Sequence, residues 1–434
     1  MTSIGVVKAY LAKPQNKIFI GNVVWLSADK LIRLVVGVVV GAWVARYLGP
    51  EEYGLLSYAL IFCSFFATIS TLGFDGIIVR ELSIDSIRAN QILGTAFYLR
   101  LIIGSILFFI SLFIIFLVES NSTLIVITSI IALGIVFQAA DVIDLWFQSQ
   151  SQSKKTIFSR GVAYLIASTL KIVIVVKAFT LVYFALVSLL EVLISSTILF
   201  ISYKKTVKKI QWVFDKGAAV SLLKEAWPYA LSSISILIYM RIDQVMIREL
   251  AGNSELGIYS AAVQLSSVFN SAPMILAIAV GPLVARLSIS DKLRCKNLLS
   301  NLFGLIWWTM LPLGVMFFIF SKDIISVVYG SAYSESSYVL GVHIFTNIPI
   351  GLGVIQSLWI VNSKRSSLSL IKTIVGAIFN IGLNYLLIPT YGALGAAYAS
   401  LIAQSISAVL CNIVISPEIF NLQLKSIFFI KSNT

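Results

Sequence analysis

Five basic residues interrupt long apolar runs of this 434-residue chain. If those runs cross a membrane, each cation costs about 2.5 to 3.5 kcal/mol to insert, so each needs a partner or a task. Lys and Arg hold phosphate oxygens through charge-assisted hydrogen bonds, and several of them together suit a ligand that is anionic yet partly lipidic. The candidate substrate-binding residues are therefore Lys30, Arg33, Arg100, Lys171 and Arg241.

Six acidic residues lie in the same runs or at their edges. A carboxylate at that depth can bind an ion in one state and release it in another, which is what energy coupling requires. Glu191 is the first candidate because it lies mid-run and has no cation near it in the sequence. Asp243 is the second, since Arg241 can hold it ionised. The candidates for ion coupling or gating are Asp29, Asp75, Asp141, Asp144, Glu191 and Asp243.

Structural roles stay open for several of these residues. Lys171 can snorkel to the outer surface. Asp75, Asp141 and Asp144 can be solvated near an interface, and Glu191 can stay protonated and hydrogen-bond a neighbouring helix. One stripe of the first run is either a packing seam or the wall of an aqueous cavity. Its members recur every fourth residue and are Asp29, Arg33, Gly37, Gly41 and Ala45.

The amino-acid composition indicates that a lipid bilayer surrounds these runs. Apolar residues make up 59% of the chain and charged residues 12%, and the mean hydropathy is +0.96. A soluble domain carries roughly a quarter charged residues. Twelve runs, from residues 18–48 to 392–415, approach the roughly 20 residues that cross a bilayer. We predict an all-α integral membrane protein with twelve transmembrane helices.

A repeat divides the chain. Residues 46–59 return in altered form at residues 248–262 with one insertion, so that Arg46 pairs with Arg248 and Gly54 with Gly257. Membrane chains with internal repeats often form two bundles around a central site. We predict two six-helix lobes, residues 1–210 and 211–434, joined by a basic linker at residues 204–224.

The net charge of +13 is distributed unevenly. Of 32 Lys and Arg residues, 23 fall in predicted inner segments, four in outer segments and five inside the runs. This is the positive-inside pattern, and it places both termini in the cytoplasm. The basic charge therefore reports topology rather than nucleic-acid binding.

The sequence shows no residue pattern for disulfide bonding, metal binding, catalysis or ATP hydrolysis. Cys63, Cys295, Cys411 and His343 show no disulfide or metal-ligand spacing and no catalytic set. No phosphate-binding loop appears, so direct ATP hydrolysis is not expected. We expect no metal and no cofactor, with a proton or sodium gradient as the candidate energy source.

Six short motifs follow one another along nearly the whole chain. They are Tyr47-Leu-Gly-Pro-Glu-Glu-Tyr-Gly, Leu72-Gly-Phe-Asp75 with Arg80, Asp141-Val-Ile-Asp144-Leu-Trp-Phe-Gln148, Trp227-Pro228, Tyr239-Met-Arg241-Ile-Asp243-Gln-Val-Met246 and Gly392-Ala-Leu-Gly-Ala-Ala397. Together they resemble O-antigen flippases. These are MATE-like proteins of the polysaccharide transporter branch of the multidrug/oligosaccharidyl-lipid/polysaccharide exporter superfamily.

The resemblance implies a two-lobed transporter, not an enzyme, in the bacterial inner membrane. Such flippases move undecaprenyl-pyrophosphate-linked O-antigen units from the cytoplasmic to the periplasmic leaflet by alternating access, during lipopolysaccharide biosynthesis. Membrane lipid, the polymerase and the chain-length regulator of the pathway are the implied partners. The binding residues are not family motifs, so the five cations above rest on their depth alone.

Two other functions compete with this prediction. A cation-coupled multidrug exporter of the same superfamily would favour acids and aromatics around a cationic drug, which five buried cations would repel. A membrane-embedded O-antigen polymerase would need a larger outer loop to hold the sugar chain, and the outer segments of this chain are short.

The predicted topology can be tested with two reporter fusions. A fusion at Lys209, between the lobes, should report the cytoplasm, and one at Glu335, in the longest outer segment, should report the periplasm. The opposite signal at either site would overturn the count of twelve spans.

Overall fold

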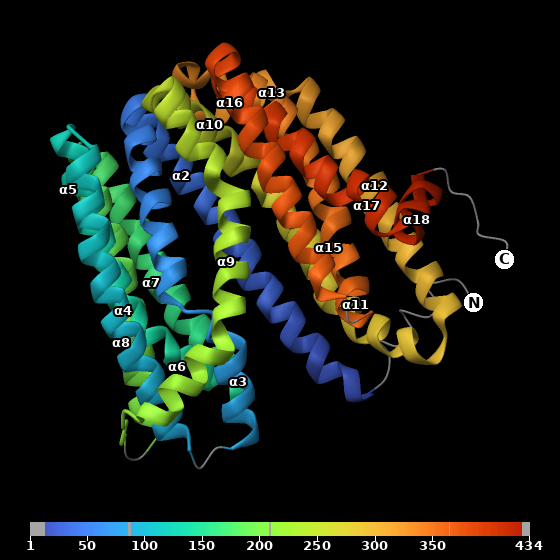
Figure 1. Cartoon of the computed structure of the whole chain (residues 1–434). Coiled ribbons are helices and arrows are strands. Elements are labelled where there is room, and N and C mark those ends of the chain that lie inside the picture. The colour runs from blue at the N-terminus through green and yellow to red at the C-terminus, as the bar shows by residue number, and fades with distance from the viewer. Residues whose placement is uncertain (1–13, 86–87, 208–209, 364, 428–434) are drawn as a thin grey trace. The chain divides into compact units, whose positions relative to one another are not determined.

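Every regular element in the described part of the chain is helical. The computed structural model describes residues 14–85, 88–207, 210–363 and 365–427, and for residues 14–32 and 366 the backbone alone. Helices are expected because hydrocarbon offers no partner for backbone N–H and C=O groups, and a helix satisfies them internally. Figure 1 shows these helices as coiled ribbons, many of them long.

The chain divides into two compact units by its internal contacts. The N-terminal unit is Trp43–Arg241, and the C-terminal unit joins the residues up to Ala42 with those from Ile242 onward. Two helices, α2 (Pro14–Ser70) and α9 (Lys216–Ala251), therefore pass from one unit to the other. The lobes 1–210 and 211–434, which follow the repeat rather than contacts, stay a prediction.

The N-terminal unit is built around the second part of α2 and six further helices. In chain order the latter are α3 (Asp75–Ile84), α4 (Ala89–Val118), α5 (Ser122–Phe137), α6 (Val142–Ser149), α7 (Ser153–Val176) and α8 (Leu181–Thr206), with a 3-10 turn, Gln138–Asp141, between α5 and α6.

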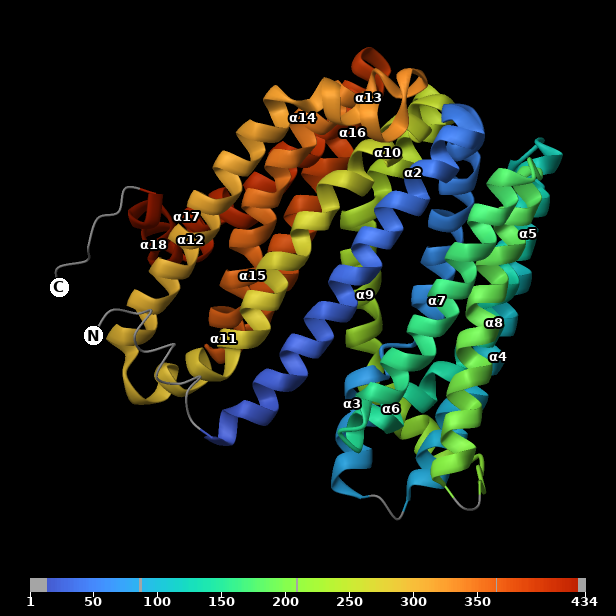
Figure 2. The same ribbon diagram turned by 180° about the vertical axis from the view of Figure 1, so that it is seen from behind.

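The C-terminal unit contains the first part of α2, the end of α9 and nine later helices. These are α10 (Asn253–Ser266), α11 (Ser271–Ser290), α12 (Lys292–Ile319), α13 (Ser321–Tyr329), α14 (Ser336–His343), α15 (Asn347–Asn362), α16 (Ser366–Ser405), α17 (Cys411–Ile415) and α18 (Pro417–Ile427). Short 3-10 turns at Ser267–Asn270, Ser331–Tyr333 and Ile344–Thr346, and a π-helix at Ile406–Leu410, connect some of them. Figure 2 shows α11, α12, α14 and α15 together in this unit.

The predicted number of spans is confirmed for the described residues. Ten helical stretches are long and apolar enough to cross a membrane. Two of them, Arg33–Ile84 and Ser367–Ile415, have 52 and 49 residues, more than twice the roughly 20 needed. Each is broken at a glycine with positive φ, Gly49 in α2 and Gly392 in α16. Counting each as two spans raises ten to twelve.

The sequence repeat is also a repeat of backbone geometry. Gly49 has φ 70° and ψ 172°, and Gly252 has φ 97° and ψ 177°. The two align once Ala251 is taken as the inserted residue. Only glycine adopts this conformation readily. In each half it ends one long helix and begins the next.

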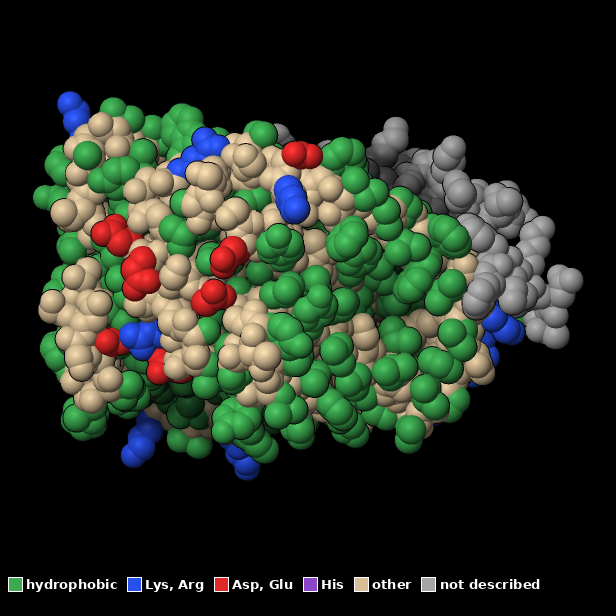
Figure 3. All heavy atoms as spheres, turned by 90° about the horizontal axis from the view of Figure 1, so that it is seen from above, with side chains coloured by type: hydrophobic (Ala, Val, Ile, Leu, Met, Phe, Trp, Pro, Cys, Tyr) green, Lys and Arg blue, Asp and Glu red, His purple; other side chains and the backbone are tan. Residues whose placement is uncertain are grey.

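The surface has the composition of a lipid-facing one. Large apolar side chains on α4 are more than half exposed, among them Phe109, Phe113 and Phe116. In water so many exposed apolar groups would be unfavourable. Figure 3 shows hydrophobic side chains over much of the face seen from above, with most of its acidic side chains gathered in the left half.

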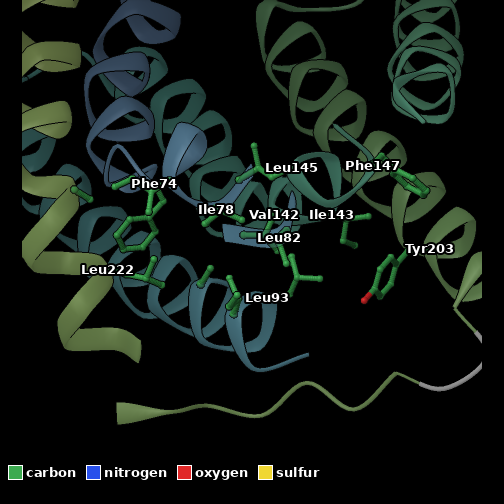
Figure 4. Packing of buried hydrophobic residues seen from close by; sticks show 14 of the residues in the cluster. Phe74, Ile78, Leu82, Leu93, Val142, Ile143, Leu145, Phe147, Tyr203 and Leu222 are labelled. Carbon is green, nitrogen blue, oxygen red and sulfur yellow. The ribbon is translucent and has the colours of Figure 1, made fainter. Parts of the chain in front are cut away.

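The predicted linker at residues 204–224 is in fact part of the N-terminal unit. The Trp212 indole donates to the Tyr203 hydroxyl at 3.2 Å, and the backbone N–H of Asp215 donates to Thr95 Oγ1 at 3.0 Å. Leu222 of α9 is buried in the same apolar cluster as Phe74, as Figure 4 shows. Aromatic and apolar side chains, which the charge of the segment conceals, anchor it.

Two features of the N-terminal unit require glycine at Gly73: its backbone conformation and its close approach to α9. Gly73, in the turn between α2 and α3, has φ +67°, and an added Cβ would lie 2.5 Å from the backbone nitrogen of Ala230 on α9. Gly73→Ala should lower stability by about 1 to 3 kcal/mol through left-handed strain and overpacking. We expect a clearly lower melting temperature in detergent.

Gly76, three residues later, provides the matched control. It lies in α3, and an added Cβ there meets nothing within 4 Å. Gly76→Ala should be neutral or slightly stabilising, by up to about 1 kcal/mol. Equal melting temperatures for the two variants would show that the turn does not depend on Gly73.

Candidate functional site

A buried carboxylate lies where three helices of the C-terminal unit meet. Asp243, on α9, is 6% exposed. It accepts a short hydrogen bond from the Tyr259 hydroxyl of α10 and one of 3.2 Å from Ser400 Oγ of α16. Two hydroxyl groups from neighbouring helices thus donate to this carboxylate.

Two amides extend this cluster along α16. Asn380 Nδ2 donates to Ser400 Oγ at 3.5 Å, and Asn384 Nδ2 donates to Asn380 Oδ1 at 3.0 Å. Both side chains are at most 3% exposed, and Asn384 Oδ1 is buried without a hydrogen-bond partner. The cluster therefore combines one carboxylate, two hydroxyls and a spare amide oxygen. Oxygen groups of this kind suit a proton or a hard cation.

A second layer holds Tyr259. His343 of α14 places its ring edge-on to the Tyr259 ring, with centroids 5.8 Å apart. Its Nδ1 lies 2.6 Å from Ser266 Oγ on α10. The sequence alone leaves His343 without a role, whereas the structure shows that it buttresses the tyrosine that binds Asp243.

Of this cluster, sequence reasoning identified only Asp243. The sequence analysis missed its four neighbouring polar residues, Tyr259, Ser400, Asn380 and Asn384. Asn380 and Asn384 do stand four residues apart inside an apolar run. Because side chains at that spacing share one helical face, this signal could have been used.

The N-terminal unit pairs its buried charges with each other. Arg100 of α4 is 3% exposed, as its depth in the run predicts. Its guanidinium donates to Asp75 at 2.5 Å and to the Thr71 carbonyl at 3.1 Å, while its Nε has no partner. Arg100 therefore holds the turn before α3 and is not an isolated cation.

Asp141 and Asp144 share a cation with each other. Arg160 of α7 lies 3.0 Å from Asp144 and 3.6 Å from Asp141. Asp144 is buried, so solvation near an interface does not describe it. Its cationic partner, Arg160, belongs to a different helix, α7.

Glu191 has a cation after all. Lys171 Nζ on α7 lies 3.9 Å from Glu191 on α8, and both side chains are partly exposed. The local sequence offers Glu191 no cation, and a neighbouring helix supplies one in the structure. Its role in coupling stays a prediction.

The glycine stripe of α2 packs as a seam. Gln264 of α10 donates to the Gly37 carbonyl at 2.9 Å, and an added Cβ on Gly41 would strike the Gln264 side chain. Arg33, on the same stripe, is partly buried. The side chains of Asp29 and Lys30 lie outside the described residues.

Arg241 is exposed on α9. Whether it and the other predicted cations line a cavity between the lobes stays a prediction. In the described part of the chain, no three His, Cys, Asp or Glu residues are grouped to hold a metal ion.

Comparison with known proteins places this chain in a family. Residues 19–288, more than half of the chain, match the profile described as "Polysaccharide biosynthesis protein". The chain belongs to this family. A second profile, MatE, matches residues 228–386.

Named relatives of this family member are distant. The "Probable low-salt glycan biosynthesis flippase Agl15" of Haloferax volcanii is 25% identical over 42% of this chain and 38% of its own length. The "Probable flippase AglR" of the same organism is 25% identical over 45% and 42%. A protein of the Lsg locus of Haemophilus influenzae is 25% identical over 74% and 79%. The matches to the two archaeal relatives thus span well under half of their lengths.

Solved structures share the fold of this family member. An inward-facing multidrug resistance MATE family transporter of the MOP superfamily aligns with a TM-score of 0.70 at 15% identity, over 92% of this chain and 99% of its own. Lipid II flippase MurJ, in an inward closed conformation, aligns with a TM-score of 0.70 at 16% identity, over 95% and 91%. At these identities the likeness concerns the fold, and it confirms the predicted MATE-like architecture.

The Arg100–Asp75 pair gives an asymmetric prediction. Asp75→Ala leaves a buried guanidinium without its counter-charge, which should cost about 3 to 5 kcal/mol. Arg100→Met leaves only Asp75, whose side chain is 63% exposed and can be solvated. Asp75→Ala should therefore lower the melting temperature more than Arg100→Met, and Arg100→Met should rescue Asp75→Ala. A larger loss for Arg100→Met would contradict the pairing.

Proposed function

We propose that this chain is a flippase that moves lipid-linked glycan units across a membrane. The observation that carries the proposal is the match of residues 19–288 to the polysaccharide biosynthesis family. Relatives named as flippases and the fold shared with the lipid II flippase support it. A sugar chain needs a shielded path through hydrocarbon, and a helical bundle with polar side chains inside can provide one.

The finer proposal names the substrate and the setting. We propose undecaprenyl-pyrophosphate-linked O-antigen units, moved by alternating access from the cytoplasmic to the periplasmic leaflet of a bacterial inner membrane, in lipopolysaccharide biosynthesis. Both termini are cytoplasmic in this proposal. Polymerase and chain-length regulator act on the product. The diphosphate would be held by cations, with Arg241 as the leading candidate, since it is exposed on α9, whereas Asp75 already neutralises Arg100 and Glu191 lies beside Lys171.

Energy coupling is assigned to the Asp243 cluster in this proposal. Its hydroxyl donors and the neighbouring amides supply oxygen groups that suit a proton or a sodium ion beside the carboxylate. Asp243, the second candidate from sequence, thereby moves ahead of Glu191. Tyr259, Ser400 and Asn380 would orient the carboxylate and supply the remaining oxygens.

A second candidate function is multidrug export. The MatE profile over residues 228–386 favours it, and so does the fold of the MATE transporters. An exposed cation such as Arg241 would oppose the binding of cationic drugs, so the flippase remains the stronger proposal.

Reconstituted vesicles can separate these functions. Purified protein in proteoliposomes should translocate a fluorescent diphosphate-linked oligosaccharide lipid, and an excess of cationic drug should not compete. Accumulation of the drug without movement of the glycan lipid would favour the exporter.

The same assay tests coupling. Asp243→Asn should abolish the response of transport to an imposed pH or sodium gradient, whereas Glu191→Gln should respond as the wild type does. The two variants are matched, since each replaces a single carboxylate by its amide. A normal gradient response in Asp243→Asn at normal protein level would remove the C-terminal cluster from the coupling mechanism.

A further inference from the structure

Three hydroxyl side chains form a stripe along α9. Ser232, Ser235 and Tyr239 lie three and four residues apart, and Asp243 follows four residues after Tyr239. Side chains at these spacings share one face of a helix. The three hydroxyl residues are partly exposed near the middle of a membrane-spanning stretch of 36 residues, whereas Asp243 is buried. The stripe therefore leads along a single helix to the carboxylate proposed for coupling.

The serine hydroxyls of the stripe keep acceptor capacity. Ser232 Oγ donates to the Pro228 carbonyl at 2.9 Å, and Ser235 Oγ donates to the Leu231 carbonyl at 2.8 Å. A hydroxyl group has one proton and two lone pairs, so each oxygen can still accept from water or hold a small cation. Water can therefore reach both serines without breaking a hydrogen bond within α9.

The internal repeat marks the same helix face independently. The pairing of Arg46 with Arg248 is an offset of 202 residues (248 − 46), and with this offset the stripe of α9 falls on the glycine stripe of α2. The members pair as Ser235 with Arg33, Tyr239 with Gly37, and Asp243 with Gly41. In transporters built from repeats, ion sites lie near the bilayer midplane at the interface of the repeats. A polar stripe at the repeat-equivalent position is thus where an ion route is expected.

The cluster at the end of the stripe contains an unsatisfied acceptor. Asn384 Oδ1 is buried without a hydrogen-bond partner, and its amide nitrogen connects through Asn380 and Ser400 to Asp243. A buried carbonyl oxygen without a donor is costly, and an internal water molecule commonly supplies the donor. Because hydrocarbon holds no water, such a molecule must arrive along polar side chains.

We propose that the hydroxyl stripe of α9 faces water and is the route by which a proton or a sodium ion reaches Asp243. Successive members are about 4.5 to 6 Å apart along the helix axis. One water molecule bridges about 5.5 Å between two oxygens, since each O–H···O bond is about 2.8 Å long. Only the last step, the arrival at Asp243, rests on the proposed coupling function, whereas the wetting of the stripe does not.

Two serines of α9 provide a matched pair of test sites. Ser233 is partly exposed like Ser235, and its hydroxyl also donates to a carbonyl of α9, at 3.0 Å. It lies two residues away and therefore on another face. Ser233→Cys and Ser235→Cys would each be made in a Cys411→Ser background, in which Cys63 and Cys295 are buried. Each protein would be reconstituted in vesicles, with a cationic methanethiosulfonate on both sides, and the rate of thiol modification would be measured.

Ser235→Cys should react at least about tenfold faster than Ser233→Cys, because the reactive thiolate forms only where water solvates it. Ser232→Cys should behave like Ser235→Cys, and it decides the comparison if the latter variant does not fold. All variants should react fully after denaturation, which verifies the amount of thiol. Equal rates, or a faster reaction at Ser233→Cys, would show that the stripe faces lipid and would overturn the proposal.

Reversible modification then tests whether the stripe leads to Asp243. The cationic adduct on Ser235→Cys should abolish the increase in glycan-lipid transport that an imposed gradient produces, because a fixed positive charge repels a small cation. A thiol reductant should restore the increase, and the same treatment of Ser233→Cys should have no effect. Separate pH and sodium gradients on the unmodified protein identify the ion. A full response after complete modification of Ser235→Cys would contradict the route.

The two arms separate this route from the proposed coupling function. If neither gradient increases transport by the wild type, the coupling function fails, and the rates of thiol modification still decide whether the stripe is wetted.

Discussion

The absence of water inside a membrane is the constraint on which this structure depends. A backbone group without a partner, or a charge without one, costs several kcal/mol in hydrocarbon. Helices satisfy the backbone, and the apolar runs form them. The remaining polar and charged side chains must then find partners on other helices, and this requirement shapes the interior of both units.

The two units meet this requirement in different ways. In the N-terminal unit, acids and bases neutralise each other, as Arg100 does with Asp75 and Arg160 with Asp144. In the C-terminal unit, Asp243 accepts hydrogen bonds from two hydroxyls, and Lys372 donates to two amides. Polar groups from several helices thus surround a buried charge and tie those helices together.

Glycines decide where the long helices end and how closely they approach. Gly49 and Gly252 have the same positive-φ break in both halves. The internal repeat therefore holds for the backbone conformation as well as for the amino-acid sequence. At Gly41, a side chain would collide with Gln264, which instead binds the backbone of α2. The first helix can be read as a packing seam for this reason, although a seam and a cavity wall can share one helix.

The sequence by itself determined the solvent, the helical class, the number of spans, the repeat and the family, because each follows from composition or from spacing within one run. The sequence also predicted that the charged side chain of Arg100 is buried, as the structure shows. Only the tertiary structure decided the partners. Lys171 and Glu191 lie 20 residues apart in the sequence, and Asp243 and Ser400 lie 157 apart. Pairing across helices depends on which faces pack together, and local spacing does not encode that. The cation beside Glu191 and the packing of Trp212 and Leu222 into the N-terminal unit therefore became known only from contacts between helices.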